Sequence, residues 1–175
     1  MNLFDIVTFV ESEDFPANMA GISWSDCDSC GWTIAHEAAR QGKLPDGFNQ
    51  WDLSTCIGWT VAHERVCHGM MPNDFDSWDM ATNYGSTVAH EAAYHGNLPE
   101  NFDRWELADK YGRTVAHDAA AKGHLPVGFD RWDLAYSSGW TVAHEAAFLG
   151  NLPKSFNRWD LTNKYGTTVS MVAGK

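Results

Sequence analysis

Apolar and polar positions along residues 139–165 predict two short helices joined by a tight turn. Thr141 is a good helix N-cap, and the apolar residues that follow it in 142–149 fall on one side of about two helical turns. Gly150 stands where a left-handed residue commonly ends a helix. Pro153 stands at the first position of a second helix. The apolar face of that helix would carry Leu152, Phe156 and Trp159. Helices this short are marginal alone, so the pattern predicts stabilisation by packing against neighbours.

The same pattern recurs every 27 residues, and a glycine opens each unit at positions 31, 58, 85, 112, 139 and 166. Each unit reads G-x-T-[IV]-A-H-[ED], then a second glycine, then x-[LM]-P-x-x-F-x-x-W-[DE]-[LM]. We therefore expect a single repeat domain over residues 1–175. Its full repeats would be residues 31–57, 58–84, 85–111, 112–138 and 139–165, followed by a half repeat at 166–175.

Residues 1–30 read as a divergent N-terminal cap. Residues 2–12 predict a helix with one apolar face, and 15–24 echo the second half of a repeat, with Trp24 placed 27 residues before Trp51. At the other end, the half repeat has no second helix to cover it. We expect it to expose apolar surface.

The unit G-x-T-x-x-H-x-A-A-x-x-G-x-L resembles the ankyrin repeat, whose signature is T-P-L-H-x-A-A followed by G-H-L. GRTVAHDAAAKGHL at 112–125 is nearest to that signature. The unit is shorter, 27 residues against about 33, and it carries F-x-x-W where ankyrin repeats carry an aliphatic run. We place the shortfall as one turn missing from the second helix and two residues missing from the loop. The resemblance implies an all-α, ankyrin-like helix-turn-helix solenoid that binds proteins on its concave and loop-tip surface.

The charge of the chain limits the classes of molecule that it is expected to bind. The formal net charge is −11, and residues 1–100 hold 15 acidic and three basic side chains against eight and nine in 101–175. This balance disfavours direct binding to nucleic acid or anionic membranes. No apolar run is long enough to span a membrane, the acidic N-terminus differs from a secretory signal, and the four cysteines favour a reducing compartment. We expect a cytoplasmic protein, or one delivered into a host cell as an effector.

Repeated ionisable residues favour structural roles. The histidines recur one per repeat and lack the H-E-x-x-H spacing of a metalloprotease: His36, His63, His90, His117 and His144. Packed repeats lie roughly 8–10 Å apart, too far for two of these histidines to share one ion. The ankyrin resemblance implies that each histidine bridges its threonine and neighbouring backbone. The acidic residues after them suit a helix N-terminus, yet they would also form an acidic surface for a basic partner at Glu37, Glu64 and Glu91.

Cys27, Cys30 and Cys56 form a weak metal candidate, because a single C-x-x-C pair with one further cysteine falls short of a zinc motif. No phosphate-binding glycine loop, GxSxG motif or nucleophile beside a free base is present. We therefore expect no enzyme activity and no cofactor.

Positions that vary while their surroundings repeat favour partner contact. One such slot follows the opening glycine, and another precedes the glycine that ends the first helix. By the ankyrin resemblance, both slots face a partner, and exposed aromatic and arginine side chains are typical interface anchors. The predicted partner-binding residues are Trp32, Trp59, Tyr94, His95, Arg113, Trp140 and Phe148. The alternative for the tryptophans is that they lie over neighbouring repeats.

We expect a non-catalytic protein-binding module, an inhibitor or an adaptor, whose unidentified partner is a protein, either basic or nucleic-acid-binding. One alternative is an acidic nucleic-acid mimic that inhibits a nucleic-acid-binding protein such as a host or phage defence component. Another is an oligomeric structural spacer. The chain would be a monomer or a weak homodimer paired through the half repeat.

Overall fold

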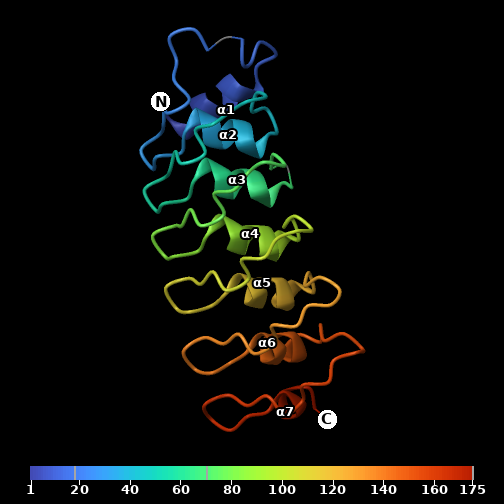
Figure 1. The fold of residues 1–175 in the computed structure, drawn as a ribbon. Coiled ribbons are helices and arrows are strands. Elements are labelled where there is room, and N and C mark those ends of the chain that lie inside the picture. The colour runs from blue at the N-terminus through green and yellow to red at the C-terminus, as the bar shows by residue number, and fades with distance from the viewer. Residues whose placement is uncertain (18, 70, 175) are drawn as a thin grey trace. The chain divides into compact units, whose positions relative to one another are not determined.

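The computed structural model describes residues 1–17, 19–69 and 71–174, which divide into two compact units, Met1–Tyr84 and Gly85–Lys175. Helices are the only extended regular elements in these described ranges, which confirms the all-α class. Unit 1 contains α1 (Leu3–Glu11), α2 (Ile34–Arg40) and α3 (Val61–Cys67). Unit 2 contains α4 (Val88–His95), α5 (Val115–Lys122), α6 (Val142–Phe148) and α7 (Val169–Val172). Within each unit every helix packs on the next along the chain (Figure 1).

The repeated Thr-x-x-His pattern starts the five helices α2 to α6. Thr33 is the N-cap of α2 and accepts a hydrogen bond from the backbone N–H of His36, while the His36 side chain reaches back to the backbone N–H of Thr33. This reciprocal capping box satisfies two of the donors that a helix N-terminus leaves free. It recurs at 27-residue intervals, because α2 to α6 begin after Thr33, Thr60, Thr87, Thr114 and Thr141.

The prediction of a second helix in each repeat is wrong. Two tight turns replace it, closed in the fifth repeat by Phe156 N–H to Pro153 C=O at 3.0 Å and Leu161 N–H to Arg158 C=O at 3.3 Å. Backbone carbonyl groups of the turns in the fourth repeat accept hydrogen bonds from the start of α6: Val142 N–H donates to Leu134 C=O, and Ala143 N–H donates to Trp132 C=O. These bonds satisfy N–H groups in the first turn of α6 and hold the turns of the fourth repeat against that helix.

Aromatic rings stabilise the turns in place of that helix. In unit 2 the rings of consecutive repeats meet edge to face, at 5.5 Å between Trp105 and Phe129 and 5.1 Å between Trp132 and Phe156. Within a repeat, Phe129 and Trp132 meet at 5.3 Å. Unit 1 builds the same array from Phe9 to Trp78. Such pairs add to the burial of the rings, so the predicted Phe and Trp core forms without helical spacing.

A hairpin-like loop leads into each helix and packs on the loop of the next repeat. In unit 2 isolated bridges pair Ala108 with Thr114 and Ala135 with Thr141. Gly85 lies at the tip of such a loop with φ +82, and a Cβ there would lie 2.6 Å from the backbone nitrogen of Lys110. A positive φ recurs at all six opening glycines and explains their 27-residue period, and the close approach of backbone adds a second constraint at Gly85.

Candidate functional site

The variable slot after each opening glycine places its side chain over the histidine of the same repeat. Trp32 lies tilted over His36, with ring centroids 5.1 Å apart, and its indole Nε1–H donates to Glu37 at 3.3 Å. Trp59 donates to Glu64 at 3.1 Å. All three tryptophans of this slot are half-buried, and each covers a histidine at 5.0–5.1 Å. One edge of each indole is therefore bound within its own repeat, and the remainder faces solvent.

Beneath this slot, the histidine side chain bonds to a backbone carbonyl of the next repeat, as seen for His36, His90, His117 and His144. In the fourth repeat, His117 Nδ1 accepts the backbone N–H of Thr114 at 3.2 Å, so its proton lies on Nε2. Nε2–H then donates to the carbonyl of Trp140 at 3.2 Å. Burial lowers the pKa of His117 to about 4 and also lowers the pKa values of His36 and His90. These rings bind repeat to repeat in each unit.

The third repeat carries Ser86 in the slot where three other repeats carry tryptophan. The Ser86 hydroxyl donates to Glu91 at 3.2 Å. A cavity of about 260 Å³ opens beside it and is lined by Ser86, His90, Glu91, Tyr94, Asp109, Arg113 and Asp118. Burial raises the pKa of Glu91, and the hydroxyl of Ser86 opposes that shift only in part. The third repeat therefore presents a partly desolvated carboxylate at the base of an open cavity.

The fourth repeat fills the same slot with Arg113. Its guanidinium lies 2.8 Å from the Asp118 carboxylate and 3.7 Å from that of Glu145. Arg113 Nε is buried and has no hydrogen-bond partner among the described residues. Burial raises the pKa of Asp118 to about 7, although the charge of Arg113 acts in the opposite direction. The ion pair thus compensates only part of the cost of burying Asp118.

Contacts connect the predicted partner residues of unit 2 into one continuous surface. Trp140 donates to Glu145 at 2.9 Å, and its ring meets that of Phe148 at 6.3 Å. Arg113 approaches the same Glu145 and also lines the cavity beside Tyr94. The described side chains that vary between repeats and meet here form the unit 2 patch: Ser86, Tyr94, Arg113, Trp140 and Phe148.

Exposure within this patch is uneven. Phe148 is 70% exposed and Tyr94 43% exposed, while Arg113 and Trp140 are half-buried. His95, next to Tyr94, is exposed, and Lys122 Nζ lies 4.1 Å above the Tyr94 ring. The most accessible apolar surface therefore comes from the C-terminal ends of α4 and α6.

Unit 1 brings Trp32 and Trp59 together at an apolar cavity. This cavity has a volume of about 360 Å³ and is lined by Cys30, Trp32, Thr55, Cys56, Ile57, Trp59 and Glu64. Ile57, which the sequence reading did not single out, is 47% exposed there. Its position just before the opening glycine is also held by exposed Tyr111 and Tyr165 in unit 2.

Glu37 departs from the expected acidic surface. The residue is only 1% exposed, because Arg40 and Gln41 on the same helix and the indole of Trp32 donate to its carboxylate. Burial alone would raise the pKa of Glu37, but the hydrogen bonds from Arg40 and Gln41 outweigh it and hold the pKa below its ordinary value. Glu64 and Glu91 are partly exposed.

The cysteine candidate is not assembled as a site. Cys27, Cys30 and Cys56 are free and exposed. Across the ranges that the structure describes, no group of three ligand atoms within 4.8 Å of one another includes any of these thiols.

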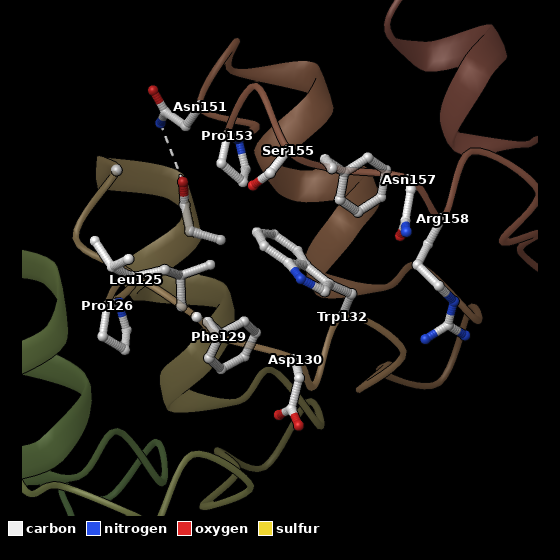
Figure 2. A pocket seen from close by; sticks show the side chains of 15 residues that line it. Leu125, Pro126, Phe129, Asp130, Trp132, Asn151, Pro153, Ser155, Asn157 and Arg158 are labelled. Atoms are coloured by element: carbon white, nitrogen blue, oxygen red, sulfur yellow. Dashed lines mark hydrogen bonds between the residues drawn. The ribbon is translucent and has the colours of Figure 1, made fainter.

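A groove that the sequence reading missed follows from the absent second helix. In unit 2 a cavity of about 530 Å³ lies between the proline turns of the fourth and fifth repeats, with Trp132 between Phe129 on one side and Pro153 and Ser155 on the other (Figure 2). Asn151 closes one end by donating to the Ala120 carbonyl at 3.0 Å. A predicted helix would have filled this volume, so the hydrophobic pattern alone could not reveal it.

None of the described helices has the length and apolar composition needed to cross a lipid bilayer.

Comparison with known proteins identifies the fold. No protein-family model matches the chain, and no curated protein is similar to it. The crystal structure of the ankyrin repeat domain of Bcl-3, described as a unique member of the IkappaB protein family, is similar to this chain with a TM-score of 0.61. The sequence identity is 19%, and the match covers 97% of this chain and 86% of that chain. The resemblance to ankyrin repeats is therefore confirmed at the level of the fold.

Proposed function

We propose that the chain is a non-catalytic module, an inhibitor or an adaptor, that binds a partner protein. Unit 2 would bind through Tyr94, His95, Arg113, Trp140 and Phe148. Unit 1 would bind through Trp32 and Trp59, whose indoles flank the apolar cavity. Free, exposed cysteines suit a reducing compartment inside a cell.

The continuity of the unit 2 patch carries this proposal. Three different repeats contribute to it, and its members differ from repeat to repeat although the frame beneath them does not. Aromatic and arginine side chains dominate the binding energy of protein interfaces. A rigid frame also holds them with little loss of conformational entropy on binding. The arrangement therefore concentrates interface anchors on a surface that needs no rearrangement to bind.

The test removes only the exposed anchors. The indoles of Trp32, Trp59 and Trp140 cover histidines and hydrogen-bond to carboxylates, so replacing them would disturb the fold. Tyr94→Ala with Phe148→Ala removes solvent-exposed rings instead. Val127→Ala in a proline turn is the matched control, because that side chain is fully exposed and lies outside the patch.

Partners captured from source-cell extract would be compared among the wild type, the double variant and the control. We expect one partner to be retained by the wild type and by Val127→Ala and lost from the double variant. Each anchor should contribute on the order of 1–2 kcal/mol, or roughly tenfold in affinity. Equal retention by all three baits would refute a binding role for the unit 2 patch.

The charge of unit 1 favours a second candidate, the nucleic-acid mimic. Residues 1–84 carry 13 acidic and three basic side chains, whereas residues 85–175 carry ten and nine. A basic partner bound by that charge would dissociate steeply with added salt, since exposed charges are screened over about 8 Å at physiological ionic strength. Retention of the partner by Tyr94→Ala with Phe148→Ala, together with release by moderate salt, would support this candidate over the first.

A further inference from the structure

The repeats provide an internal standard for the slot after the opening glycine. In the first, second and fifth repeats the slot holds an indole that stacks over the repeat's histidine at 5.0–5.1 Å. Its Nε1–H donates to the carboxylate of the following glutamate at 2.9–3.3 Å. The third repeat keeps both of the groups that receive the indole, His90 and Glu91, but supplies only Ser86.

The space that an indole would occupy is open in the third repeat. The cavity of about 260 Å³ borders Ser86, His90 and Glu91 together. His90 is 3% exposed, while the other four histidines of the series are completely buried. The part of His90 that lines this cavity and the carboxylate of Glu91 therefore correspond to the two groups that tryptophan contacts in the other repeats.

We propose that this cavity binds the indole of a tryptophan side chain from the partner protein. The ring would lie over His90, and its N–H would donate to Glu91. This inference rests on the proposed function, because it names the side chain that a bound partner inserts into the unit 2 patch.

Three acidic side chains and one arginine line the cavity, and the bonds that two of the carboxylates already make favour an indole over a cation. Arg113 lines the cavity and would repel a second cation, whereas its guanidinium can approach the negative face of an aromatic ring. Two other carboxylates at the cavity are already bonded: Asp118 pairs with Arg113 at 2.8 Å, and Asp109 accepts the backbone N–H of Arg113 at 2.9 Å. Glu91, bonded to the neutral hydroxyl of Ser86, is the acceptor that corresponds to the indole-bonded glutamates. Tyr94 adds an aromatic wall.

The probe is 5-fluoroindole, observed by fluorine NMR in a titration with the full chain. A fragment of this size should bind with a dissociation constant on the order of 1–10 mM. The comparison compound is 5-fluoro-1-methylindole, which keeps the ring and lacks the N–H donor. Loss of a hydrogen bond to a charged acceptor should weaken binding roughly tenfold or more.

Two variants locate the site. Ser86→Trp fills the slot from within and should abolish binding of 5-fluoroindole, with helical content checked by circular dichroism. Ser137→Trp places the same side chain on an exposed loop and should leave binding unchanged. The comparison of the two indoles uses the wild-type chain and stays decisive if Ser86→Trp fails to fold.

Binding that requires the N–H and is lost only in Ser86→Trp would support the proposal. Equal affinity for both indoles, absence of binding, or displacement of indole by methylguanidinium at lower concentration would each overturn it. Partner capture separates this inference from the proposed function. A patch whose double variant loses the partner while 5-fluoroindole does not bind would leave the function standing and reject only the indole site.

Discussion

Replacing Asp118 by asparagine should stabilise the fold at alkaline pH, although the change removes one side of an ion pair. The Asp118 carboxylate lies 2.8 Å from the Arg113 guanidinium, and its side chain is only 14% exposed. Burial nevertheless raises the pKa of Asp118 to about 7, above its ordinary value of 3.8. Deprotonating this buried carboxyl therefore costs the folded chain more than the pairing with Arg113 returns.

Proton linkage gives the sign and the size of the contribution of Asp118 to the free energy of unfolding. Because the pKa is higher in the folded chain, the folded state binds an extra proton between pH 3.8 and about 7. The contribution to the free energy of unfolding is therefore greatest below pH 3.8 and is lost as the pH rises through 7. The full difference corresponds to about 4 kcal/mol at 1.36 kcal/mol per pKa unit. The pKa of about 7 already includes the attraction of Arg113, and asparagine does not titrate, so we expect the variant to gain about 4 kcal/mol at pH 8 relative to pH 4.

The assay is urea unfolding followed by far-ultraviolet circular dichroism, for the wild type and Asp118→Asn at pH 8 and pH 4. Protonation of the buried histidines at pH 4 affects both proteins and cancels in their difference. We expect the variant to gain about 4 kcal/mol at pH 8 and almost nothing at pH 4. A variant less stable than the wild type at pH 8 would show that the ion pair outweighs burial and would refute the reasoning.

Three further predictions concern the frame. Burial lowers the pKa of His117 to about 4, so its contribution of about 3 kcal/mol is present above pH 6.5 and lost as the pH falls toward 4; an NMR titration midpoint near 6.5 would contradict this. Gly166→Ala, with φ +79 and no atom near the new Cβ, should cost about 1 kcal/mol in urea unfolding. Gly85→Ala, whose Cβ would meet the backbone nitrogen of Lys110 at 2.6 Å, should cost roughly 1–3 kcal/mol more, and equal losses would exclude the contact as the reason for glycine. Trp132→Ala removes ring contacts at 5.3 and 5.1 Å to the phenylalanines on either side and should cost about 3–5 kcal/mol by thermal unfolding; a loss below about 1 kcal/mol would place the stability of the turns elsewhere.

The first helix of each repeat was predictable because its determinants are local. The threonine N-cap, the histidine three residues later and the alanine-rich run after it all lie within about eight residues. The structure starts α6 at Val142, where the sequence predicted, and ends it at Phe148, one residue earlier than predicted. The spacing of Phe156 and Trp159 was equally clear but ambiguous, since one face of a helix and two packed turns both bring such residues together.

The candidate site was predictable only as a set of positions. Variation along the repeats identified the slots of Trp32, Ser86 and Arg113, but variation does not say what lies beneath a side chain. The structure shows that an indole in this slot donates a hydrogen bond to the glutamate of its own repeat, and that a serine in the same slot leaves a cavity. The cavity arises because Ser86 is smaller than the tryptophan that three other repeats carry in this slot. Only the three-dimensional arrangement of the repeats shows that the space is left open.

The sequence by itself determined the repeat length, the start of the first helix in each repeat, the threonine and histidine at that start, and the uneven distribution of charge. Each of these depends on residues close together in the chain or on simple counts. Tertiary structure decided the rest: that turns replace the second helix, that Glu37 is buried and Glu91 open, and that Asp118 holds its proton near neutral pH. Those outcomes depend on hydrogen bonds from the start of each helix to the turns before it, as from Val142 to Leu134, and on burial by neighbouring repeats, and the hydrophobic pattern of the chain shows neither.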